Sequence, residues 1–227
     1  MPPRPELPLA YRIVMGVGAP IMHRWSRMKV TGMECLPATG PVIIVADHDS
    51  YWDPIAIGVA ARRVRPIRAL AKSTLWKTKI VAAFMDRMGH IPVIRGTSNT
   101  DAMAVAVEEL AKGACIGMFP EGTRSLGREL RARSGVGWLA KAVPDATVVC
   151  VRTNGTTDVV RVPKRPSVTL EFYLPRGGQL QPDESPLAFS RRLLAELREE
   201  APPEIAGRAK KAAKYRSEID AEQKSTT

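Results

Sequence analysis

The sequence predicts an α/β protein with a central sheet, mostly parallel or mixed, flanked by helices. Three observations support this prediction. Short apolar runs rich in Val and Ile recur along the 227 residues and have the length of buried strands. Helix-like segments separate these runs, which is typical of layered α/β folds. Apolar residues make up 44% of the chain, enough for one sizeable core, and no internal repeat or second core is visible.

The elements follow in the order of these runs. The predicted strands are residues 41–46, 67–71, 91–94, 115–119, 147–151 and 167–173. Start and stop signals mark the helices between them, such as Ser73 or Thr74 at a start and Gly113 at a stop. The predicted helices are residues 54–61, 74–88, 99 or 100–112, 134–142 and 186–200.

The two ends of the chain differ from this alternating pattern. The apolar N-terminal segment is interrupted by Arg12 and Pro20, and its uncharged run is too short to span a bilayer. We expect residues 1–27 to form an amphipathic helix on a membrane surface, with packing on the protein's own core as the alternative. Residues 28–200 are predicted to form the single folded domain, and residues 201–227 a polar helix or tail.

The charge balance indicates anionic partners. The net charge is +11 and the pI about 10.0, and no acid occurs between Pro54 and Met85. A positive field of this kind attracts nucleic acid, an anionic membrane or a phosphorylated substrate. The alternative is that the basic residues only form an ordinary solvated surface. The three cysteines show neither disulfide nor metal-site spacing, and Cys115 and Cys150 are expected in the core.

The first candidate site follows the strand at 41–46, in the stretch "VADHDSYWDP". The spacing of His48 and Asp53 suits side chains that meet across a turn better than neighbours on one helix face. A carboxylate bonded to an imidazole fixes its tautomer and makes it a better base. The structural alternative is that Asp53 is a helix N-cap, because Pro54 suits the first helical position.

Two later stretches have the residues of an anion site. In "MFPEGTRSLG", Gly122 allows close approach of a ligand, Thr123 adds a hydroxyl and Arg124 offers a planar set of donors for phosphate. Ligands bind at the carboxyl ends of strands in α/β proteins. Arg95 follows the strand at 91–94 and gains interest if it converges with Arg124 on one anion. A charged surface turn is the alternative for both.

Together these stretches resemble the glycerolipid acyltransferase family, which includes the lysophosphatidate acyltransferases. The family's first motif, Asn-His-x-Ser-x-x-Asp, is matched by "DHDSYWD" with Asp47 in place of Asn, and "FPEGTRS" matches the third in full. "GHIPVIRG" resembles the second motif, and "RALAKSTLW", which carries Lys72, resembles the stretch before it. The fourth usually carries a Pro, where "ATVVCVRTNGT" has Cys150 and Val151. The resemblance covers about residues 28–175.

The resemblance implies an O-acyltransferase with a glycerophosphate-acyltransferase-like domain. It implies transfer of a fatty acyl group from acyl-CoA or acyl carrier protein to lysophosphatidate, giving phosphatidate for phospholipid synthesis, without a metal or bound cofactor. His48 is the implied general base, and Asp53 orients it. The implied acceptor-phosphate site comprises Arg95, Glu121, Gly122, Thr123 and Arg124, with Glu121 expected to orient an arginine or accept from a glycerol hydroxyl. Donor or oxyanion contacts are expected from Lys72, Ser50 or an N–H group of residues 47–53.

The departures from the family pattern leave alternatives open. Asp47 either adds an acid that raises the basicity of His48 or points away and caps the turn. The altered fourth motif bears on the acyl or acceptor pocket, so glycerol 3-phosphate, a glycolipid or an ornithine lipid are alternative acceptors.

The expected partners are therefore acyl-CoA or acyl carrier protein, a lysophospholipid and an anionic membrane surface. The protein is expected to be peripheral, at the cytoplasmic face of the membrane. A basic nucleic-acid-binding protein is a distant alternative, because no helix-turn-helix, zinc or aromatic RNA-binding pattern is visible. The intact His48 and Asp53 argue against a non-catalytic membrane-binding relative.

Overall fold

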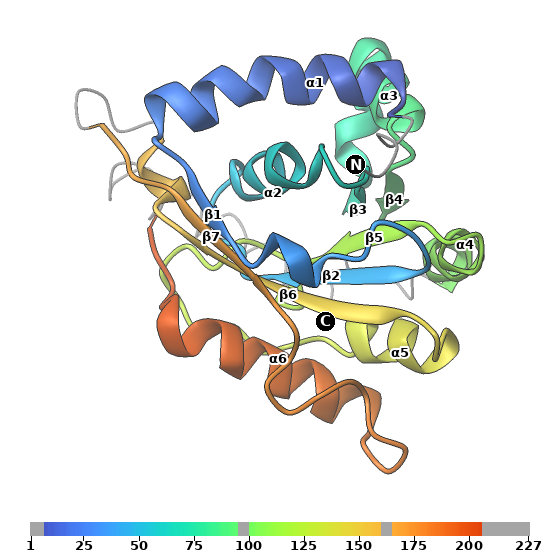
Figure 1. The fold of residues 1–227 in the computed structure, drawn as a ribbon. Helices are drawn as coiled ribbons and strands as arrows, with labels where there is room; N and C mark the ends of the chain where they lie inside the picture. The colour runs from blue at the N-terminus through green and yellow to red at the C-terminus, as the bar shows by residue number, and fades with distance from the viewer. Residues whose placement is uncertain (1–6, 95–99, 160–164, 206–227) are drawn as a thin grey trace, which may run out of the picture.

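A computed structural model describes residues 7–94, 100–159 and 165–205 and confirms the predicted fold class. Within these ranges, seven strands form one mixed sheet in the order β1-β7-β6-β2-β5-β3-β4 (Figure 1). The strands are β1 (Lys29–Thr31), β2 (Val42–Ala46), β3 (Arg68–Lys72), β4 (Ile91–Val93), β5 (Cys115–Met118), β6 (Thr147–Asn154) and β7 (Thr169–Tyr173). The strands from β6 to β4 are parallel, whereas β7 is antiparallel to β6 and parallel to β1.

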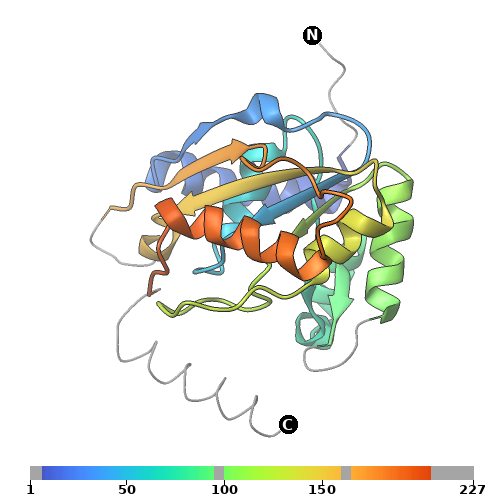
Figure 2. The same ribbon diagram turned by 90° about the horizontal axis from the view of Figure 1, so that it is seen from below.

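Helices cover both faces of the sheet (Figures 1 and 2). One layer contains α1 (Leu9–Pro20), α2 (Asp53–Ala61) and α3 (Lys79–Arg87), and the other contains α4 (Thr100–Ala111), α5 (Gly135–Ala142) and α6 (Pro186–Glu200). The shorter helical segments are η1 (Ile21–Trp25), η2 (Met33–Cys35), η3 (Ser73–Lys77) and η4 (Thr156–Asp158). The parallel strands therefore end at one edge of a sheet that is covered on both sides, which is where α/β proteins place their sites.

The central strand β2 shows why the apolar runs are continuous. Every residue of β2 is buried, because alternate side chains enter different layers. Val42, Ile44 and Ala46 belong to the core beneath α1 and α2, whereas Ile43 and Val45 belong to the core beneath α4, α5 and α6. Cys115 and Cys150 are buried, as expected from their apolar runs.

The helix α6 is held closely against α5. A Cβ atom at Gly137 would lie 2.0 Å from the carbonyl oxygen of Pro186, so only glycine permits this approach. The Gly137 N–H donates to Ser190 Oγ at 3.0 Å, and the Ser185 hydroxyl caps the start of α6. Phe189, Leu193 and Leu197 fill the core beneath α6. This anchoring fixes the direction of the last turn of α6.

The structure differs from the sequence prediction in two elements. The single helix expected over residues 74–88 is interrupted at Thr78, whose backbone is extended (φ −98°, ψ 120°), so that η3 and α3 are separate. The strand β1 was missed because its three residues form too short a run to give a pattern. The boundaries predicted for the tail reach beyond the described residues.

The N-terminal helix α1 has two different faces. Tyr11, Met15 and Ala19 are buried and pack in the core with α2. Leu9, Ile13 and Val17, which recur every fourth residue, are exposed. Packing on the protein's own core therefore accounts for one face, and the exposed apolar stripe remains for another contact. In the described ranges, no helix has both the length and the apolar character required to cross a bilayer.

Candidate active site

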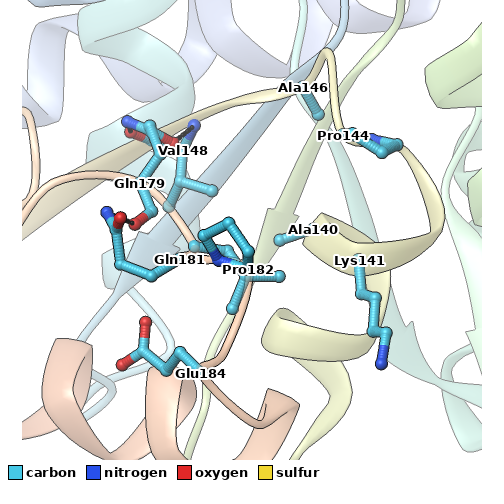
Figure 3. A pocket seen from close by; sticks show the side chains of 10 residues that line it. Ala140, Lys141, Pro144, Ala146, Val148, Gln179, Gln181, Pro182 and Glu184 are labelled. Atoms are coloured by element: carbon cyan, nitrogen blue, oxygen red, sulfur yellow. Dashed lines mark hydrogen bonds between the residues drawn. The ribbon is translucent and has the colours of Figure 1, made fainter.

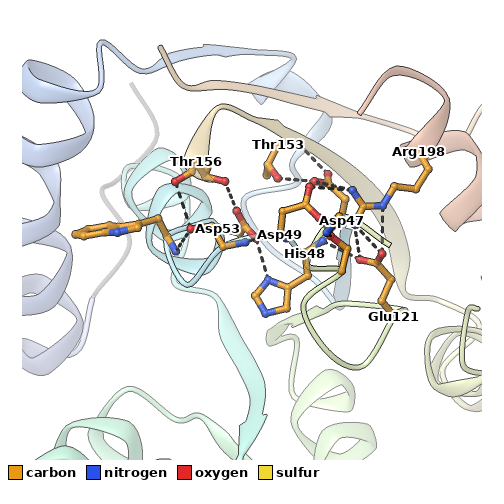
Figure 4. Close-up of polar contacts among 12 residues, drawn as sticks. Asp47, His48, Asp49, Asp53, Glu121, Thr153, Thr156 and Arg198 are labelled. Atoms are coloured by element: carbon orange, nitrogen blue, oxygen red, sulfur yellow. Dashed lines mark hydrogen bonds and ion pairs between the residues drawn. The ribbon is translucent and has the colours of Figure 1, made fainter. Parts of the chain in front are cut away.

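The turn that follows β2 brings His48 and Asp53 together. His48 Nδ1 lies 2.8 Å from Asp53 Oδ2, and the His48 side chain is 12% exposed whereas that of Asp53 is fully buried. The imidazole also stacks on the Phe119 ring, with 4.0 Å between the ring centroids. Because the carboxylate holds a hydrogen on Nδ1, Nε2 remains as the acceptor of the neutral ring. The predicted pair has the geometry of a base with a carboxylate partner (Figure 4).

Asp53 is the centre of a hydrogen-bonded turn. Its Oδ2 accepts the backbone N–H groups of Asp49 and Ser50, both at 2.8 Å, and its Oδ1 accepts the Thr156 hydroxyl at 2.5 Å. The N-cap prediction for Asp53 is wrong, because α2 begins at Asp53 and Trp52 is the preceding cap residue. The carboxylate points back into the turn, where its donors also hold it in line with His48.

Ser50 and three N–H groups of this turn are already bonded within the protein. The Ser50 hydroxyl is buried, donates to the Thr156 carbonyl at 3.2 Å and accepts the Trp52 N–H. The N–H groups of His48, Asp49 and Ser50 are bonded to carboxylates. These bonds therefore contradict an oxyanion role for the Ser50 hydroxyl and for the three N–H groups. The Ser50 hydroxyl is also buried, so it is not placed to contact the acyl donor.

Asp47 points away from His48 and towards β6. Its Oδ1 accepts the Thr153 N–H at 2.8 Å, and its Oδ2 lies 2.7 Å from the Thr153 hydroxyl. Burial, followed by the charge of Asp53, raises the pKa of Asp47 to about 8, although the Thr153 bonds and Arg198 act in the opposite direction. A neutral carboxyl group at this position makes the same pair of bonds as an Asn, the residue of the family motif.

Replacing Asp47 by Asn should stabilise the protein increasingly as the pH rises. The folded-state pKa is raised, so wild-type stability is complete below about pH 4 and falls as the unfolded chain ionises towards pH 8. We expect D47N to match the wild type near pH 4 and to exceed its free energy of unfolding by several kcal/mol at pH 8. Urea denaturation at both pH values measures this. The exposed Asp183→Asn variant is the control, and an equal gap for D47N at both pH values would contradict the expectation.

The turn that follows β5 is tied to the turn that follows β2. Glu121 Oε2 accepts the His48 N–H at 2.9 Å, and the Ser125 N–H donates to the His48 carbonyl at 2.7 Å. The Ser125 hydroxyl also donates to Asp49 Oδ1. Both backbone polar groups of His48 are therefore held by residues of the "FPEGTRS" motif, which explains why this motif accompanies the histidine.

Arg198 of α6 is the site residue that the sequence interpretation missed. Its guanidinium lies between Asp49 and Glu121, and Nη2 is 2.7 Å from Glu121 Oε1 and 3.0 Å from Asp49 Oδ1. Burial raises the pKa of Glu121, whereas Arg198 and the His48 N–H act against this rise. The expected partner of Glu121 was Arg124 or Arg95, but the carboxylate is 1% exposed and faces Arg198. Glu121 therefore supports the turn from behind rather than projecting to an acceptor.

A pocket of about 510 Å³ opens in front of His48. Its basic lining residues are Lys72, Arg124 and Arg133, and its apolar ones include Leu70, Val93, Met103, Met118 and Val136. Gly122 has φ +70°, and a Cβ there would lie 2.7 Å from Arg133 Nε, so glycine lets Arg133 approach the turn. The Arg124 guanidinium lies over the Tyr51 ring, with Cζ 3.7 Å from its centroid. The lining of the pocket thus includes an imidazole, cations and apolar side chains.

The structure brings most predicted site residues to this pocket. His48, Lys72, Gly122, Thr123 and Arg124 line it. Arg95 lies outside the described residues. In the part of the chain that the structure describes, no group of three or more His, Cys, Asp or Glu side chains is arranged to hold a metal ion. The cations suit an anionic organic substrate instead.

A second pocket of about 320 Å³ lies at the opposite end of the sheet (Figure 3). Gln179 spans it and bonds both the N–H and the carbonyl of Val148, at 2.8 and 3.1 Å. Lys141 and Glu184 are its charged lining residues. None of the residues predicted for the site lies there.

The fold and the site define an α/β protein with a histidine–aspartate pair beside a pocket that basic side chains line. A family model described as "Acyltransferase" matches residues 27–153, more than half of the chain. The chain therefore belongs to the acyltransferase family, as its motifs predicted.

Three relatives illustrate the similarity. A 1-acyl-sn-glycerol-3-phosphate acyltransferase of Bacillus subtilis is 30% identical over 43% of this chain and 49% of its own length. One from Borreliella burgdorferi is 35% identical over 45% of this chain and 41% of its own length. This chain thus spans less than half of the length of these two relatives. The crystal structure of PlsC from Thermotoga maritima, a 1-acyl-sn-glycerophosphate acyltransferase, shares the fold, with a TM-score of 0.63 and 20% identity over 84% of this chain and 78% of that one.

Proposed function

We propose that this protein transfers a fatty acyl group from a thioester to the free hydroxyl of lysophosphatidate, giving phosphatidate. The observation that carries the proposal is the His48–Asp53 pair beside a pocket whose lining includes both cations and apolar side chains. Such a pocket suits an acceptor that has both a phosphate and an acyl chain. The two bacterial relatives, both 1-acyl-sn-glycerol-3-phosphate acyltransferases, support the same acceptor class.

The proton transfers follow from the orientation of the imidazole. His48 Nε2 takes the proton of the acceptor hydroxyl as its oxygen bonds to the thioester carbonyl carbon. Asp53 stabilises the imidazolium that forms, because its Oδ2 accepts the Nδ1 hydrogen. The carbon–sulfur bond then breaks, and the imidazolium returns the proton to the leaving thiolate. The acyl donor is already activated as a thioester, so no side-chain nucleophile and no bound cofactor are required.

The acceptor phosphate is proposed to bind at the turn that follows β5. Arg124 supplies a planar guanidinium, and its contact with Tyr51 orients that plane at the pocket. Gly122 and Thr123 let the phosphate approach the backbone, and Arg133 adds a second positive charge. Arg95 is proposed as a further ligand, and Lys72 as the cation nearest the thioester oxygen. The acyl donor is acyl-CoA or acyl carrier protein, both of which are anionic.

Replacing Arg124 by Ala should chiefly weaken acceptor binding. We expect the KM for lysophosphatidate to rise at least about tenfold, with a smaller change in kcat, because a charge-assisted contact to phosphate is lost. Steady-state rates with lysophosphatidate and with a monoacylglycerol of the same chain length test this, since only the first carries the phosphate. Exposed Arg131→Ala is the matched control. An unchanged KM for lysophosphatidate in R124A would remove Arg124 from the acceptor site.

The acceptor need not be lysophosphatidate for this geometry to work. Glycerol 3-phosphate has the same phosphate, and a glycolipid or an ornithine lipid has the same kind of hydroxyl. A panel of these acceptors with one labelled thioester ranks them directly. The apolar lining of the pocket favours an acceptor that already carries an acyl chain.

We also propose that the protein is peripheral on an anionic membrane, at the cytoplasmic face. The exposed stripe of α1 (Leu9, Ile13 and Val17) and the exposed Ile80 of α3 supply apolar contact. The acid-free stretch between Pro54 and Met85 supplies basic charge around them.

Charging the α1 stripe should release the protein from vesicles. We expect Ile13→Asp/Val17→Asp to reduce binding to vesicles of equal phosphatidylcholine and phosphatidylglycerol by at least about tenfold. Two apolar side chains that would contact the lipid are replaced by carboxylates, which the anionic lipid repels. Sedimentation with the vesicles measures it. Val105→Asp, exposed on α4 in the opposite layer, is the control. Equal retention of both variants would argue against α1 as the contact.

A further inference from the structure

We infer that Arg198 is a positioning residue for His48, acting through Asp49 and Glu121 from the last turn of α6. The consequence for turnover rests on the proposed function, whereas the consequence for the imidazole rests on geometry alone. Arg198 lies beyond residues 27–153, the segment that the family model matches.

The Arg198 side chain is enclosed by acids of the two motif turns. Its Nη1 and Nη2 lie 3.0 Å from Asp49 Oδ2 and Oδ1, which is a two-point contact. Its Nη2 also lies 2.7 and 2.8 Å from the two oxygens of Glu121, and its Nε lies 3.2 Å from Oε1. Figure 4 shows the guanidinium reaching from α6 into this group of carboxylates. Nη1 also donates to the carbonyl of Ala201, so the helix end is tied in as well.

Each acid that Arg198 holds has a direct bond to the base or to its partner. Glu121 Oε2 accepts the backbone N–H of His48 at 2.9 Å. Asp49 donates its backbone N–H to Asp53 Oδ2 at 2.8 Å, the same oxygen that holds His48 Nδ1. One guanidinium thus fixes the backbone of His48 by one route and the orienting carboxylate by the other.

The charges show why a cation is required at this point. Asp49 and Glu121 are almost fully buried, with 5% and 1% of their side chains exposed, and Asp47 Oδ2 lies 4.0 Å from Arg198 Nη1. Without the guanidinium, neighbouring buried carboxylates repel each other, and one of them takes up a proton. Burial already raises the pKa of Glu121, and Arg198 opposes that rise. The repulsion moves the Glu121 carboxylate away from the His48 N–H, so the turn loosens.

The helix α6 is fixed by its packing on α5 and on the core, so it can hold Arg198 at a constant position relative to the turn. Arg192, in the middle of α6, pairs at 2.8 Å with Glu184, which precedes the helix. This second arginine bonds to Gly178, Gln179 and Glu184, which lie outside both motif turns, and it provides a matched control on the same helix.

The test uses the full-length protein in four variants: Arg198→Ala, Arg198→Lys, Arg198→Ala/Glu121→Gln and Arg192→Ala. The sequence contains only three histidines, so ¹⁵N spectra of labelled histidine resolve His48 without any assay of turnover. We expect the wild type and R192A to show His48 with its hydrogen on Nδ1. R198K should show this tautomer in a smaller fraction of the molecules. R198A should show a mixture of the two tautomers, because Asp53 is no longer aligned with Nδ1.

Kinetics supply the second readout. We expect R198A to lower kcat about 100-fold while the KM for lysophosphatidate changes less than about threefold. Adding Glu121→Gln to R198A should recover at least about tenfold of that loss, because it removes the stranded charge. If R198A does not fold, the His48 tautomer and kcat of R198K are compared with those of R192A.

The inference is overturned if R198A, or R198K in its place, retains the wild-type His48 tautomer, or if R192A causes the same losses. The inference is also overturned if Glu121→Gln deepens the defect of R198A. Absence of transfer by the wild type itself would instead count against the proposed function, and the ¹⁵N spectra would still decide the role of Arg198.

Discussion

Replacing His48 by Ala is expected to lower kcat for acyl transfer by about 10²–10⁴-fold and to leave the fold intact. The imidazole is the single group that both lines the pocket and bonds the buried Asp53 among the described residues. Its loss removes the acceptor of the hydroxyl proton, and the acceptor KM should change little because the cations remain. Initial rates with a labelled thioester, together with circular dichroism, measure both effects.

The matched control for this change is His23→Ala, because His23 is exposed on η1 and lies outside the pocket lining. We expect wild-type rates from it. Turnover by H48A at a rate close to that of the wild type would exclude His48 as the base, whatever its geometry.

Replacing Asp53 is expected to have the second largest effect, on both rate and stability. Asp53→Asn keeps the shape but loses the charge that stabilises the imidazolium, so kcat should fall about 10²-fold or more. Asp53→Ala also leaves the N–H groups of Asp49 and Ser50 without their buried acceptor. Each stranded donor costs about 1–3 kcal/mol, so D53A should lose at least about 2 kcal/mol of unfolding free energy. Parallel kinetics and urea denaturation of the two variants separate charge from structure.

Thr156→Val provides the control for Asp53, because it removes the hydroxyl that donates to the other oxygen, Oδ1. The bond to His48 is retained in this variant. We expect a loss of less than about tenfold in kcat. A D53N enzyme with a normal rate would show that the carboxylate charge has no part in the chemistry.

The parts of the fold that the sequence predicted well are those where one signal dominates. The run at Val42–Ala46 is β-branched and buried on both faces, and α6 begins at a capping Ser followed by Pro, so both elements were predicted closely. The break at Thr78 carries no Gly or Pro, and local propensity therefore gave no sign of it. The three residues of β1 depend on pairing with β7, which is remote in the sequence.

The same distinction applies to the site. His48 and Asp53 are close in sequence and follow a strand, so their meeting could be predicted from spacing and motif. The partner of Glu121 could not be predicted in this way, because Arg198 is 77 residues away in the sequence. Arg198 also belongs to a helix with several arginines, and their spacing relative to Glu121 does not distinguish one from another. One signal was present: Ser190, Leu194 and Arg198 recur every fourth residue beside the buried row of Phe189, Leu193 and Leu197, which places Arg198 on the inner face.

The N-cap interpretation of Asp53 failed for a related reason. Pro54 correctly marked the start of a helix, but the carboxylate had better donors upstream in the turn than in the helix itself. Asp47 shows the converse case, since its two alternatives were both physically sound from the sequence. Only the position of Thr153 on the neighbouring strand β6 decides between them.

We propose that His48, held by Asp53, takes the proton of the acceptor hydroxyl during acyl transfer. The most direct test is mass spectrometry of the products when pure protein meets acyl-CoA and lysophosphatidate in mixed vesicles, with H48A in parallel. We predict phosphatidate and free coenzyme A in equal amounts from the wild type, and at least about a hundredfold less of both from H48A. Release of coenzyme A with free fatty acid in place of phosphatidate, or equal phosphatidate from H48A, would contradict the claim.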